Sequence, residues 1–435
     1  MLTGGLGASA RDLSTLFVVR AVELYLREGG AFAFVMPHGV LSRKPHTGFR
    51  TGEWMTNKSE HLTVEFQESW DLARVKTGFP MVSCVAYGRR SATAAAIPGT
   101  TLVWRGTFPR ADIPWSEASQ NITRKPSEVV ALNSTDDLPA SPYKALFRNG
   151  AILYPRVLMF VSEVAAGPLG SGAGRIAVES MRASQEKQPW KELPALTGRV
   201  ETDFIHPVYL GETVAPFLNL TPRRAVLPLR HGSSTVLPKG EVDEYPGLGS
   251  WWEAAELAWD QNKVDGDEDM LIERIDYHAQ LSAQLPLDPL RVVYNKSGNT
   301  LAAALVRDSD AVIDHKLYWC PVAGEAEGHY LCAVINSKLL LDRVKPLQAL
   351  GLFGGRDWDK NIFAAVFPIF DPANDLHSRI ADLGQHAEEV AQTVNVSGAS
   401  TFQVARKTVR IALADDGVAK DIEMAVTELI PPPLS

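Results

Sequence analysis

Residues 11–50 contain the pattern that most restricts the fold: a helix, a Gly-Gly turn, an apolar strand and a basic loop follow one another. In residues 11–28, RDLSTLFVVRAVELYLRE, apolar side chains recur at the spacing of one helical face. Asp12 is the expected N-cap, and Gly29 and Gly30 are expected to end the helix. AFAFVMP follows as a continuous apolar run, which is typical of a strand buried on both faces of an α/β sheet.

Two further segments of the N-terminal part have strand character. Residues 62–69 read LTVEFQES and residues 82–88 read VSCVAYG. The stretch between them, WDLARVKTGFPM, is expected to be a helix-like loop. We therefore predict that residues 1–92 form half of an α/β sheet that ends in an antiparallel hairpin. A strand that ends in a loop at the edge of such a sheet often forms one wall of a ligand site.

The residue composition and pattern of the remaining sequence change twice. Residues 93–145 are rich in Ser, Thr, Ala, Pro and Asp, so we expect an irregular connector with one strand, TTLVWRG. Residues 146–370 contain short apolar runs separated by Pro and Gly, which predicts a mixed, β-rich domain interrupted by two helices. Residues 371–435 are predicted to form two amphipathic helices. A length of 435 residues is enough for two or three domains.

Composition excludes several classes of protein. The formal net charge of −8 argues against coating nucleic acid by bulk charge, although a local basic cleft stays compatible with it. Hydrophobic residues make up 45% of the chain, yet no run approaches the ~18 apolar residues of a membrane span. We see no signal peptide. The 3 cysteines are too few and too scattered for a disulfide scaffold or a metal pattern, so we expect a cytoplasmic protein.

Several short motifs are weak signals. GPLGSGAGRI places Gly170, Gly172 and Gly174 after an apolar run; we expect a flexible loop, with a phosphate cradle as the alternative. DQNKVDGDEDM resembles a calcium loop, but its ligand spacing is out of register with the EF-hand pattern. No His/Cys/Asp/Glu set has the spacing of a zinc site, so no metal is expected.

The order of the N-terminal motifs resembles a known family. DLSTLFVVRAVELYLREGGAFAFVMPHGVLS, followed by TGFPMVSCVAYG, is similar to the middle of a gamma-type adenine-N6 DNA methyltransferase from type II restriction–modification systems. VVYNKSGNTLAAALV, HYLCAVINSKLL and GLFGGRDWDKNIFAAVFPIFDP resemble the target-recognition domain of the large single-chain members. The resemblance runs from about Asp12 to Leu383. It implies that residues 1–92 are the C-terminal half of a Rossmann-like methyltransferase sheet and residues 146–370 a DNA-binding domain.

The resemblance also assigns roles near the first strand. A base inside a duplex must be extruded before its amino nitrogen can meet a methyl donor. Phe79, in a Phe-Pro context, is implied to stack on that base; the alternative is a ring that fills the hairpin core. Asp12 and Leu16 would lie beside the cofactor or base pocket, or else be a simple N-cap and a core leucine. Pro37 would lie beside the cofactor, whereas His38 is expected to be a surface loop residue.

Several polar residues are candidates for DNA contacts. Each has a structural alternative: a solvated charge for the first three, a hairpin turn for the next two, and an internal ion pair for Arg356. The candidates are Arg43, Lys44, Arg50, Asn295, Lys296, Arg356 and Lys360. The basic segment 223–230 is expected either to line a cleft or to be an edge strand protected by arginine. Trp251 and Trp252 are expected to pack in the core rather than to stack on bases.

The sequence departs from the family at its centre. The Asn/Asp-Pro-Pro-aromatic signature, which positions the target amine in the family, occurs nowhere in it. The glycine-rich motif that binds S-adenosylmethionine is also missing. The resemblance therefore implies a truncated or split product, which binds S-adenosylmethionine and methylates only together with an N-terminal methyltransferase fragment or subunit. Alone, the chain is expected to be inactive and poorly soluble, because half a sheet has unpaired edges.

Two hypotheses about function stay open. In the first, the chain is the C-terminal portion of a site-specific DNA adenine-N6 methyltransferase of a restriction–modification or phage-defence system. In the second, it is a stand-alone DNA-specificity subunit that binds a site and recruits a separate methyltransferase or nuclease. Both name double-stranded DNA as a partner. A restriction nuclease is disfavoured, because no Pro-Asp…Asp/Glu-x-Lys cluster stands out.

Overall fold

In the computed structural model, the chain forms two compact units. The first unit comprises Met1–Pro139 and Val344–Ala364, and the second comprises Ala140–Arg343 and Ala365–Ser435. The structure describes residues 13–43, 46–56, 60–77, 79, 81–110, 112–128, 140–167, 170–182, 186–264, 266–348, 350–351, 354–355 and 357–430.

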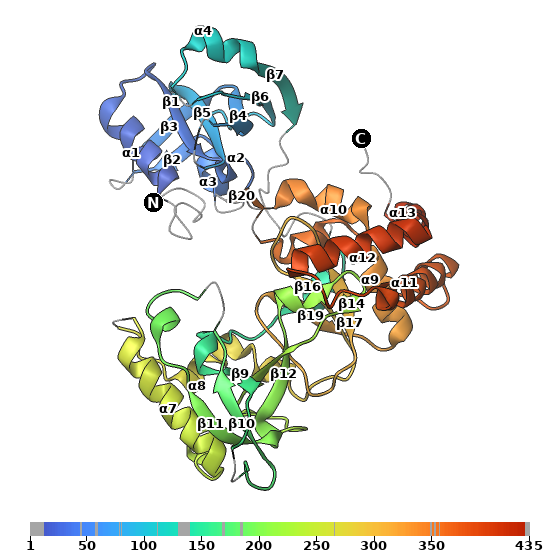
Figure 1. The fold of residues 1–435 in the computed structure, drawn as a ribbon. Coiled ribbons are helices and arrows are strands. Elements are labelled where there is room, and N and C mark those ends of the chain that lie inside the picture. The colour runs from blue at the N-terminus through green and yellow to red at the C-terminus, as the bar shows by residue number, and fades with distance from the viewer. Residues whose placement is uncertain are drawn as a thin grey trace. The chain divides into compact units, whose positions relative to one another are not determined.

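The first unit is built on one seven-stranded mixed sheet (Figure 1). Its strands follow the order β2-β3-β5-β4-β6-β7, and β1 pairs with β5 beside this path. β1 and β4 each run antiparallel to β5, whereas β4 and β6 run parallel to each other. The strands are β1 (Ala31–Pro37), β2 (Glu53–Met55), β3 (His61–Phe66), β4 (Ser69–Lys76), β5 (Ser83–Arg90), β6 (Thr100–Thr107) and β7 (Ile122–Glu128).

Helix α1 (Ser14–Tyr25) covers one face of this sheet through its valine stripe. The stripe shares a core with residues of β1, β3 and β5 and consists of Val18, Val19 and Val22. The helix begins after Leu13, so the expected N-cap, Asp12, precedes the capping position and lies outside the described residues. The helix ends earlier than expected, because Leu26 is already extended, and the Gly-Gly turn follows the helix instead of ending it. Gly29 has a φ of 77°, and its N–H donates to the carbonyl of Arg90 at 2.8 Å.

Short elements complete the first unit. The loop after β1 contains two single-turn helices, and a third precedes β7. A small two-stranded sheet is contributed by the later segment of this unit. These elements are α2 (Gly39–Ser42), α3 (Thr47–Arg50), α4 (Trp115–Ala118), β20 (Leu350–Gly351) and β21 (Gly354–Gly355).

The structure corrects three expectations for the first unit. β1 is buried on one face only, since buried and exposed residues alternate along it and Val35 is 54% exposed. The segment expected to be a helix-like loop contains the strand β4, which lies between β5 and β6. The expected connector 93–145 contributes β6 and β7 to the same sheet, so the unit extends to Pro139 rather than to residue 92. An apolar run alone does not show which faces of a strand are covered, because this depends on the elements that pack on the sheet, here α1 on one face.

The second unit is β-rich, as predicted. A six-stranded sheet has the order β11-β10-β9-β15-β12-β18, a four-stranded sheet has the order β17-β16-β19-β8, and β13 pairs with β14. The strands are β8 (Arg148–Asn149), β9 (Phe160–Glu163), β10 (Arg175–Ser180), β11 (Thr197–Glu201), β12 (Ile205–Tyr209), β13 (Val214–Ala215), β14 (Leu218–Asn219), β15 (Arg223–Val226), β16 (Arg291–Asn295), β17 (Ala303–Val306), β18 (Val312–Ile313) and β19 (Leu317–Pro321).

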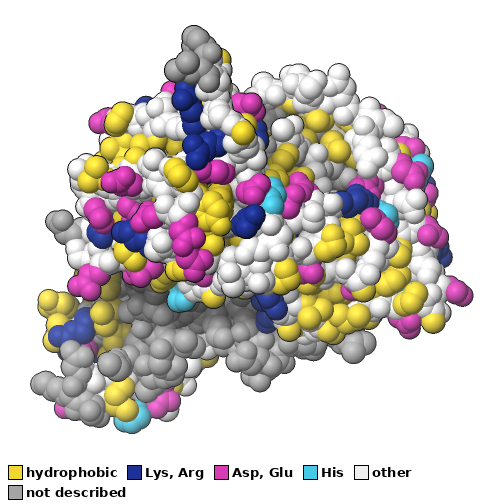
Figure 2. Space-filling view, turned by 90° about the horizontal axis from the view of Figure 1, so that it is seen from below, with side chains coloured by type: hydrophobic (Ala, Val, Ile, Leu, Met, Phe, Trp, Pro, Cys, Tyr) yellow, Lys and Arg dark blue, Asp and Glu magenta, His cyan; other side chains and the backbone are white. Residues whose placement is uncertain are grey.

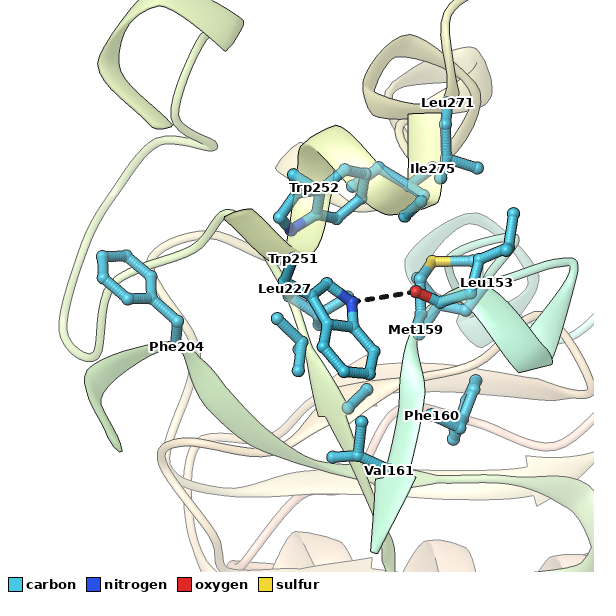
Figure 3. Packing of buried hydrophobic residues seen from close by; sticks show 14 of the residues in the cluster. Leu153, Met159, Phe160, Val161, Phe204, Leu227, Trp251, Trp252, Leu271 and Ile275 are labelled. Atoms are coloured by element: carbon cyan, nitrogen blue, oxygen red, sulfur yellow. Dashed lines mark hydrogen bonds between the residues drawn. The ribbon is translucent and has the colours of Figure 1, made fainter. Parts of the chain in front are cut away.

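Helix α7 (Pro246–Asn262) covers the six-stranded sheet with its tryptophans (Figure 3). Trp251 and Trp252 are each 3% exposed. The indole N–H of Trp251 donates to the carbonyl of Leu158 at 3.0 Å, which satisfies its polar atom inside the core. The expectation that this Trp pair serves packing is therefore confirmed.

Helices dominate the C-terminal part of the second unit. The tail was expected to contain two amphipathic helices, and it contains three, because Gly417 adopts a left-handed conformation with φ 98° and separates α12 from α13. The helices of this unit are α5 (Tyr143–Leu146), α6 (Lys239–Val242), α7, α8 (Leu271–Arg274), α9 (Glu325–Asn336), α10 (Lys338–Val344), α11 (Asp375–Thr393), α12 (Phe402–Asp416) and α13 (Val418–Leu429).

Candidate functional site

At one edge of the first sheet, the end of β1 lies beside the start of β5, next to the loop that carries Phe79, although these segments are far apart in the sequence. Pro37, the last residue of β1, pairs with Ser83 at the start of β5, and the N–H of His38 donates to the carbonyl of Val82 at 3.0 Å. The loop that carries Phe79 joins β4 to β5 and therefore lies at this same edge. We name Pro37, His38, Phe79 and Met81 the β1 edge site.

Phe79 is exposed, as stacking on a base requires. Its side chain is 48% exposed, and the neighbouring Met81 is 51% exposed. The alternative, in which the Phe79 ring fills the core of the hairpin, is therefore wrong. The stacking role itself stays a prediction, and so does the placement of Pro37 beside a cofactor.

His38 makes a contact that the sequence did not indicate. Its Nε2 lies 3.2 Å from Oδ1 of Asp71, and their side chains are 21% and 18% exposed. The register explains the contact, since Met36 pairs with Cys84 and Cys84 pairs with Asp71, which places the neighbouring His38 close to the carboxylate. No sequence signal connects two residues 33 positions apart on strands that do not pair directly, so only the sheet order reveals the pair.

The charge state of Asp71 is set by two opposing effects. Burial raises the pKa of Asp71, but the hydrogen bond and charge of His38 lower it, together with the backbone N–H of Ala73 at 2.8 Å and the charge of Arg74. The net result is a pKa below the usual value, so Asp71 is a carboxylate at neutral pH. An ionised Asp71 accepts a hydrogen bond from Nε2–H and fixes the orientation of the His38 ring at the β1 edge site.

Cys84, below the same edge, is not a nucleophile. It is fully buried, and its thiol lies 3.5 Å from the carbonyl of Pro37, to which it donates. Burial, followed by the charge of Asp71, raises the pKa of the Cys84 thiol far above neutrality. The cysteines Cys320 and Cys332 are likewise free and buried.

Leu16 does not belong to the core of α1. It is 37% exposed, whereas the buried residues of the helix are Thr15 and the three valines of the stripe. The alternative of a core leucine is therefore wrong. Its predicted place beside a cofactor or base pocket stays a prediction, and Asp12 lies outside the described residues.

The expectation that Arg50 contacts phosphate is wrong. Arg50 is 5% exposed, and its guanidinium donates to the carbonyls of Val40 at 3.1 Å and Arg43 at 2.7 Å and to Oγ1 of Thr47 at 3.2 Å. Burial lowers the pKa of Arg50 to about 10. The side chain therefore fastens the loop that follows β1. Arg43 is exposed and stays a candidate, and Lys44 lies outside the described residues.

Asn295 is also a structural residue. It is 1% exposed, and its Nδ2 donates to the carbonyls of Ser297 at 2.7 Å and Thr300 at 3.0 Å. Its Oδ1 accepts from the N–H of Ala302 at 2.6 Å, so the amide closes the turn between β16 and β17. The predicted DNA contact of Asn295 is wrong because every donor and acceptor is used inside this turn.

Three further candidates for DNA contacts come from residues 296–360. Lys296 is half-buried, with its ammonium 5.8 Å from the ring centroid of Tyr318. Lys360 is half-buried as well, and Arg356 lies outside the described residues. Contacts of Lys296, Lys360 and Arg356 with DNA stay predictions.

The basic segment 223–230 is not an edge strand. β15 pairs with β12 on one side and with β9 on the other. Its arginines face carboxylates: Arg223 lies 3.5 Å from Glu212, and Arg224 lies 3.1 Å from Glu163. On the face seen in Figure 2, Lys and Arg side chains occur in small separate groups among acidic and apolar ones. The alternative role of segment 223–230, lining a cleft, stays a prediction.

The weak motifs give no ligand site. The glycine-rich loop leads into β10, a strand, so the helix that a phosphate cradle needs does not follow it; Gly170, Gly172 and Gly174 all have positive φ. Among the described residues no cluster of His, Cys, Asp and Glu could hold a metal ion. Within the same residues no helix combines the length and apolar composition that a membrane crossing requires.

A polar hollow of about 310 Å³ lies in the second unit, and its charges are satisfied internally. Arg307, just after β17, donates to Glu388 of α11 at 2.6 Å and to Glu325 of α9 at 2.6 Å. His329 of α9 lies 2.8 Å from Glu388. We name these four residues the Arg307 network. Because each charge meets an opposite charge, the hollow is a structural junction of β17, α9 and α11.

Comparison with known proteins supports the fold class. No protein-family model matches the chain, and no curated protein matches it. The solved structure of the Type IIL restriction-modification enzyme MmeI in complex with DNA is similar over 100% of this chain, with 10% identity and a TM-score of 0.53. The chain spans 52% of the length of MmeI. The chain therefore has an α/β fold related to that of a restriction-modification enzyme: a partial sheet, a mixed β-rich unit and C-terminal helices.

Two other restriction-modification structures are more distant. The type IIG restriction endonuclease BpuSI has 12% identity and a TM-score of 0.30, over 96% of this chain and 49% of that chain. A nuclease-deletion mutant of the Type ISP enzyme LlaGI, in complex with a DNA substrate mimic, has 8% identity and a TM-score of 0.39, over 87% of this chain and 36% of that chain.

Proposed function

We propose that this chain is the C-terminal portion of a site-specific DNA adenine-N6 methyltransferase of a restriction–modification or phage-defence system. It provides the base-stacking edge and the DNA-reading unit, and it works with a polypeptide that binds the methyl donor. One observation carries the proposal: an exposed aromatic ring, Phe79, lies at the edge of the sheet where β1 ends. The fold likeness to MmeI, solved with DNA, supports the same class of partner, double-stranded DNA.

In this proposal an adenine that leaves the duplex stacks on Phe79. Stacking on an aromatic ring contributes roughly 1–3 kcal/mol per base, which offsets part of the cost of unstacking. His38, oriented by Asp71, lies at the same edge and restricts the approach of the base from the side of β1. The second unit holds the surrounding duplex, with Lys296, Arg356 and Lys360 as the proposed contacts.

S-adenosylmethionine does not fit the described residues of the first unit by themselves. A hollow of about 290 Å³ beside α1 and β1 is lined by alanine, leucine, phenylalanine and tyrosine side chains. None of these residues carries a charge for the amino-acid part of the donor or a carboxylate for its ribose. We therefore assign donor binding to the partner polypeptide and derive no step of the transfer from this chain.

A second candidate function is a stand-alone DNA-specificity subunit. The observation in its favour is that the described residues do not complete a donor site, whereas the second unit has an extensive core of its own. The two candidates differ in one respect: a specificity subunit binds its site with unchanged affinity when Phe79 is replaced.

The proposal is tested by co-expression of the full chain with the polypeptide encoded directly upstream. We expect the pair to methylate host DNA, measured as resistance to a nuclease that is blocked by the modification. Phe79→Ala should lower methylation by roughly 5- to 150-fold, which corresponds to the loss of ~1–3 kcal/mol of stacking.

Met81→Ala is the matched control, since Met81 is 51% exposed in the same loop. We expect its methylation to equal that of the wild type. A soluble pair that binds the donor without methylating DNA contradicts the proposal. Equal rates for Phe79→Ala and the wild type remove Phe79 from the site.

A further inference from the structure

β1 has one side without a pairing strand. Along its whole length, from Ala31 opposite Arg89 to Pro37 opposite Ser83, it pairs with β5 on one side. Among the described residues no strand pairs with its other side. Its sequence, AFAFVMP, contains no charged residue, although exposed edges are usually protected by charges, bulges or covering elements. The free side of β1 is therefore an unprotected edge.

Apolar side chains surround this edge on both faces. On the face of α1, Phe17 meets Phe34 edge to face with centroids 6.3 Å apart, and the apolar hollow beside α1 and β1 includes Tyr25. On the opposite face Val35 is exposed beside Val85. The exposed fractions are 65% for Leu13, 67% for Phe17, 57% for Leu24, 82% for Tyr25 and 54% for Val35. We name these five residues the open edge patch; large apolar side chains exposed in such numbers around one strand mark an interaction site.

The position of α1 specifies what pairs with the edge. The helix leads directly into β1 and packs on its face (Figure 1), as the helix of a β-α-β unit does. In such a unit a strand precedes the helix and lies parallel to the strand that follows it, with a right-handed connection. The sheet already contains a parallel pair, β4 and β6. The free side of β1 is therefore the position of one more parallel strand.

Residues 1–12 are poor candidates for that strand. They read MLTGGLGASARD, with three glycines and one β-branched residue, a composition that disfavours a strand. The similarity to MmeI extends over 52% of that enzyme, so its remaining length contains chain that has no counterpart in these residues. Polypeptide outside residues 1–435 thus fits the edge better than residues 1–12 do.

We propose that the free side of β1 and the open edge patch bind a polypeptide that adds a strand parallel to β1 and buries Phe17, Tyr25 and Val35. This inference rests on the proposed function, because it identifies that polypeptide with the donor-binding half of the methyltransferase sheet. Strand addition supplies backbone hydrogen bonds along β1, and the patch supplies the apolar contacts.

The experiment uses the full chain and the polypeptide encoded directly upstream. We expect a one-to-one complex in size-exclusion chromatography with light scattering. On complex formation, residues 31–37 should exchange amide hydrogen at least tenfold more slowly. Phe17→Glu and Val35→Lys should each weaken the complex at least tenfold. The matched controls Leu257→Glu and Val264→Lys, which change residues 59% and 78% exposed in the second unit, should leave it unchanged.

The outcomes separate this inference from the proposed function. A complex that protects residues 31–37 but does not methylate DNA supports the interface and contradicts the function. A complex that methylates DNA but is insensitive to Phe17→Glu and Val35→Lys contradicts the interface alone. Failure of the upstream polypeptide to bind overturns the inference. A stable dimer of this chain that the same two variants dissociate also overturns it, because the occupant is then a second copy.

Discussion

At the scale of single residues, burial separates arginines that look alike in the sequence. Arg43 and Arg50 lie in one basic loop, and both were expected to contact phosphate. The loop folds back so that Arg50 is 5% exposed and donates to two carbonyls, while Arg43 stays in solvent. A guanidinium with several hydrogen bonds inside a loop is a structural cross-link, and its charge is not available to a ligand.

This contrast gives a prediction for the loop. Arg50→Ala leaves two carbonyls without their donor, a loss of about 1–3 kcal/mol for each buried group, and should speed hydrogen exchange of residues 38–50. Arg43→Ala should leave hydrogen exchange unchanged. If Arg43 contacts a phosphate, the same change should reduce by about one the slope of the logarithm of the DNA-binding constant against the logarithm of the salt concentration. An Arg50→Ala protein with unchanged exchange but a reduced salt dependence would restore Arg50 as a phosphate contact.

At the scale of elements, the C-terminal helices are joined to the β-rich unit by close contact and by charge. A Cβ placed on Gly384 of α11 would lie 2.3 Å from the carbonyl oxygen of His329 in α9, so the two helices approach as closely as only glycine permits. The Arg307 network lies one turn further along α11. The residues expected to form a separate C-terminal segment, 371–435, are therefore part of the second unit.

The Arg307 network predicts a pH dependence of stability. Burial raises the pKa of Glu388, but hydrogen bonds from Arg307 and His329 and their charges lower it to about 2. Because this folded-state pKa lies below the unfolded value of 4.5, the network stabilises the fold above about pH 4.5, and the stabilisation disappears as the pH falls toward 2. Glu388→Gln should lower the free energy of unfolding by about 2–4 kcal/mol at pH 7.

Denaturant unfolding at several pH values measures this effect. The difference between Glu388→Gln and the wild type should shrink as the pH falls from 5 to about 2. Glu389→Gln is the control, because the Glu389 side chain is 60% exposed and its loss should change stability by less than about 0.5 kcal/mol. A difference that is constant with pH would show that Glu388 acts through packing rather than through its charge.

At the scale of the whole molecule, the first unit exposes an apolar strand edge and large apolar side chains, which most sheets cover with further strands or helices. An apolar edge strand next to a patch of large apolar residues is an association site. The double substitution of Phe17→Glu with Val35→Lys should raise the soluble fraction of the chain expressed alone. Leu257→Glu with Val264→Lys, the matched pair in the second unit, should raise it less. Equal gains from both pairs would show that general surface charge is responsible, and ultracentrifugation of cleared lysates measures the fractions.

The sequence alone determined the local elements whose patterns are strong. The helix before the Gly-Gly turn, the strand AFAFVMP and the packing role of Trp251 were predicted from periodicity, turn residues and burial preference, because these depend on neighbours within one or two turns. The exposure that a stacking role for Phe79 requires agrees with the turn that its sequence neighbours, Gly78 and Pro80, favour.

Only the tertiary structure decided which strands pair and which charges are free. The order β1-β5-β4 places His38 beside Asp71, and the loop after β1 folds back and buries Arg50. The positions of these residues in the sequence predict neither result, because both depend on how the chain folds in three dimensions. The same order exposes one side of β1. The neighbours of a strand are specified by the whole sheet, and among the described residues β1 has a pairing strand on only one of its two sides.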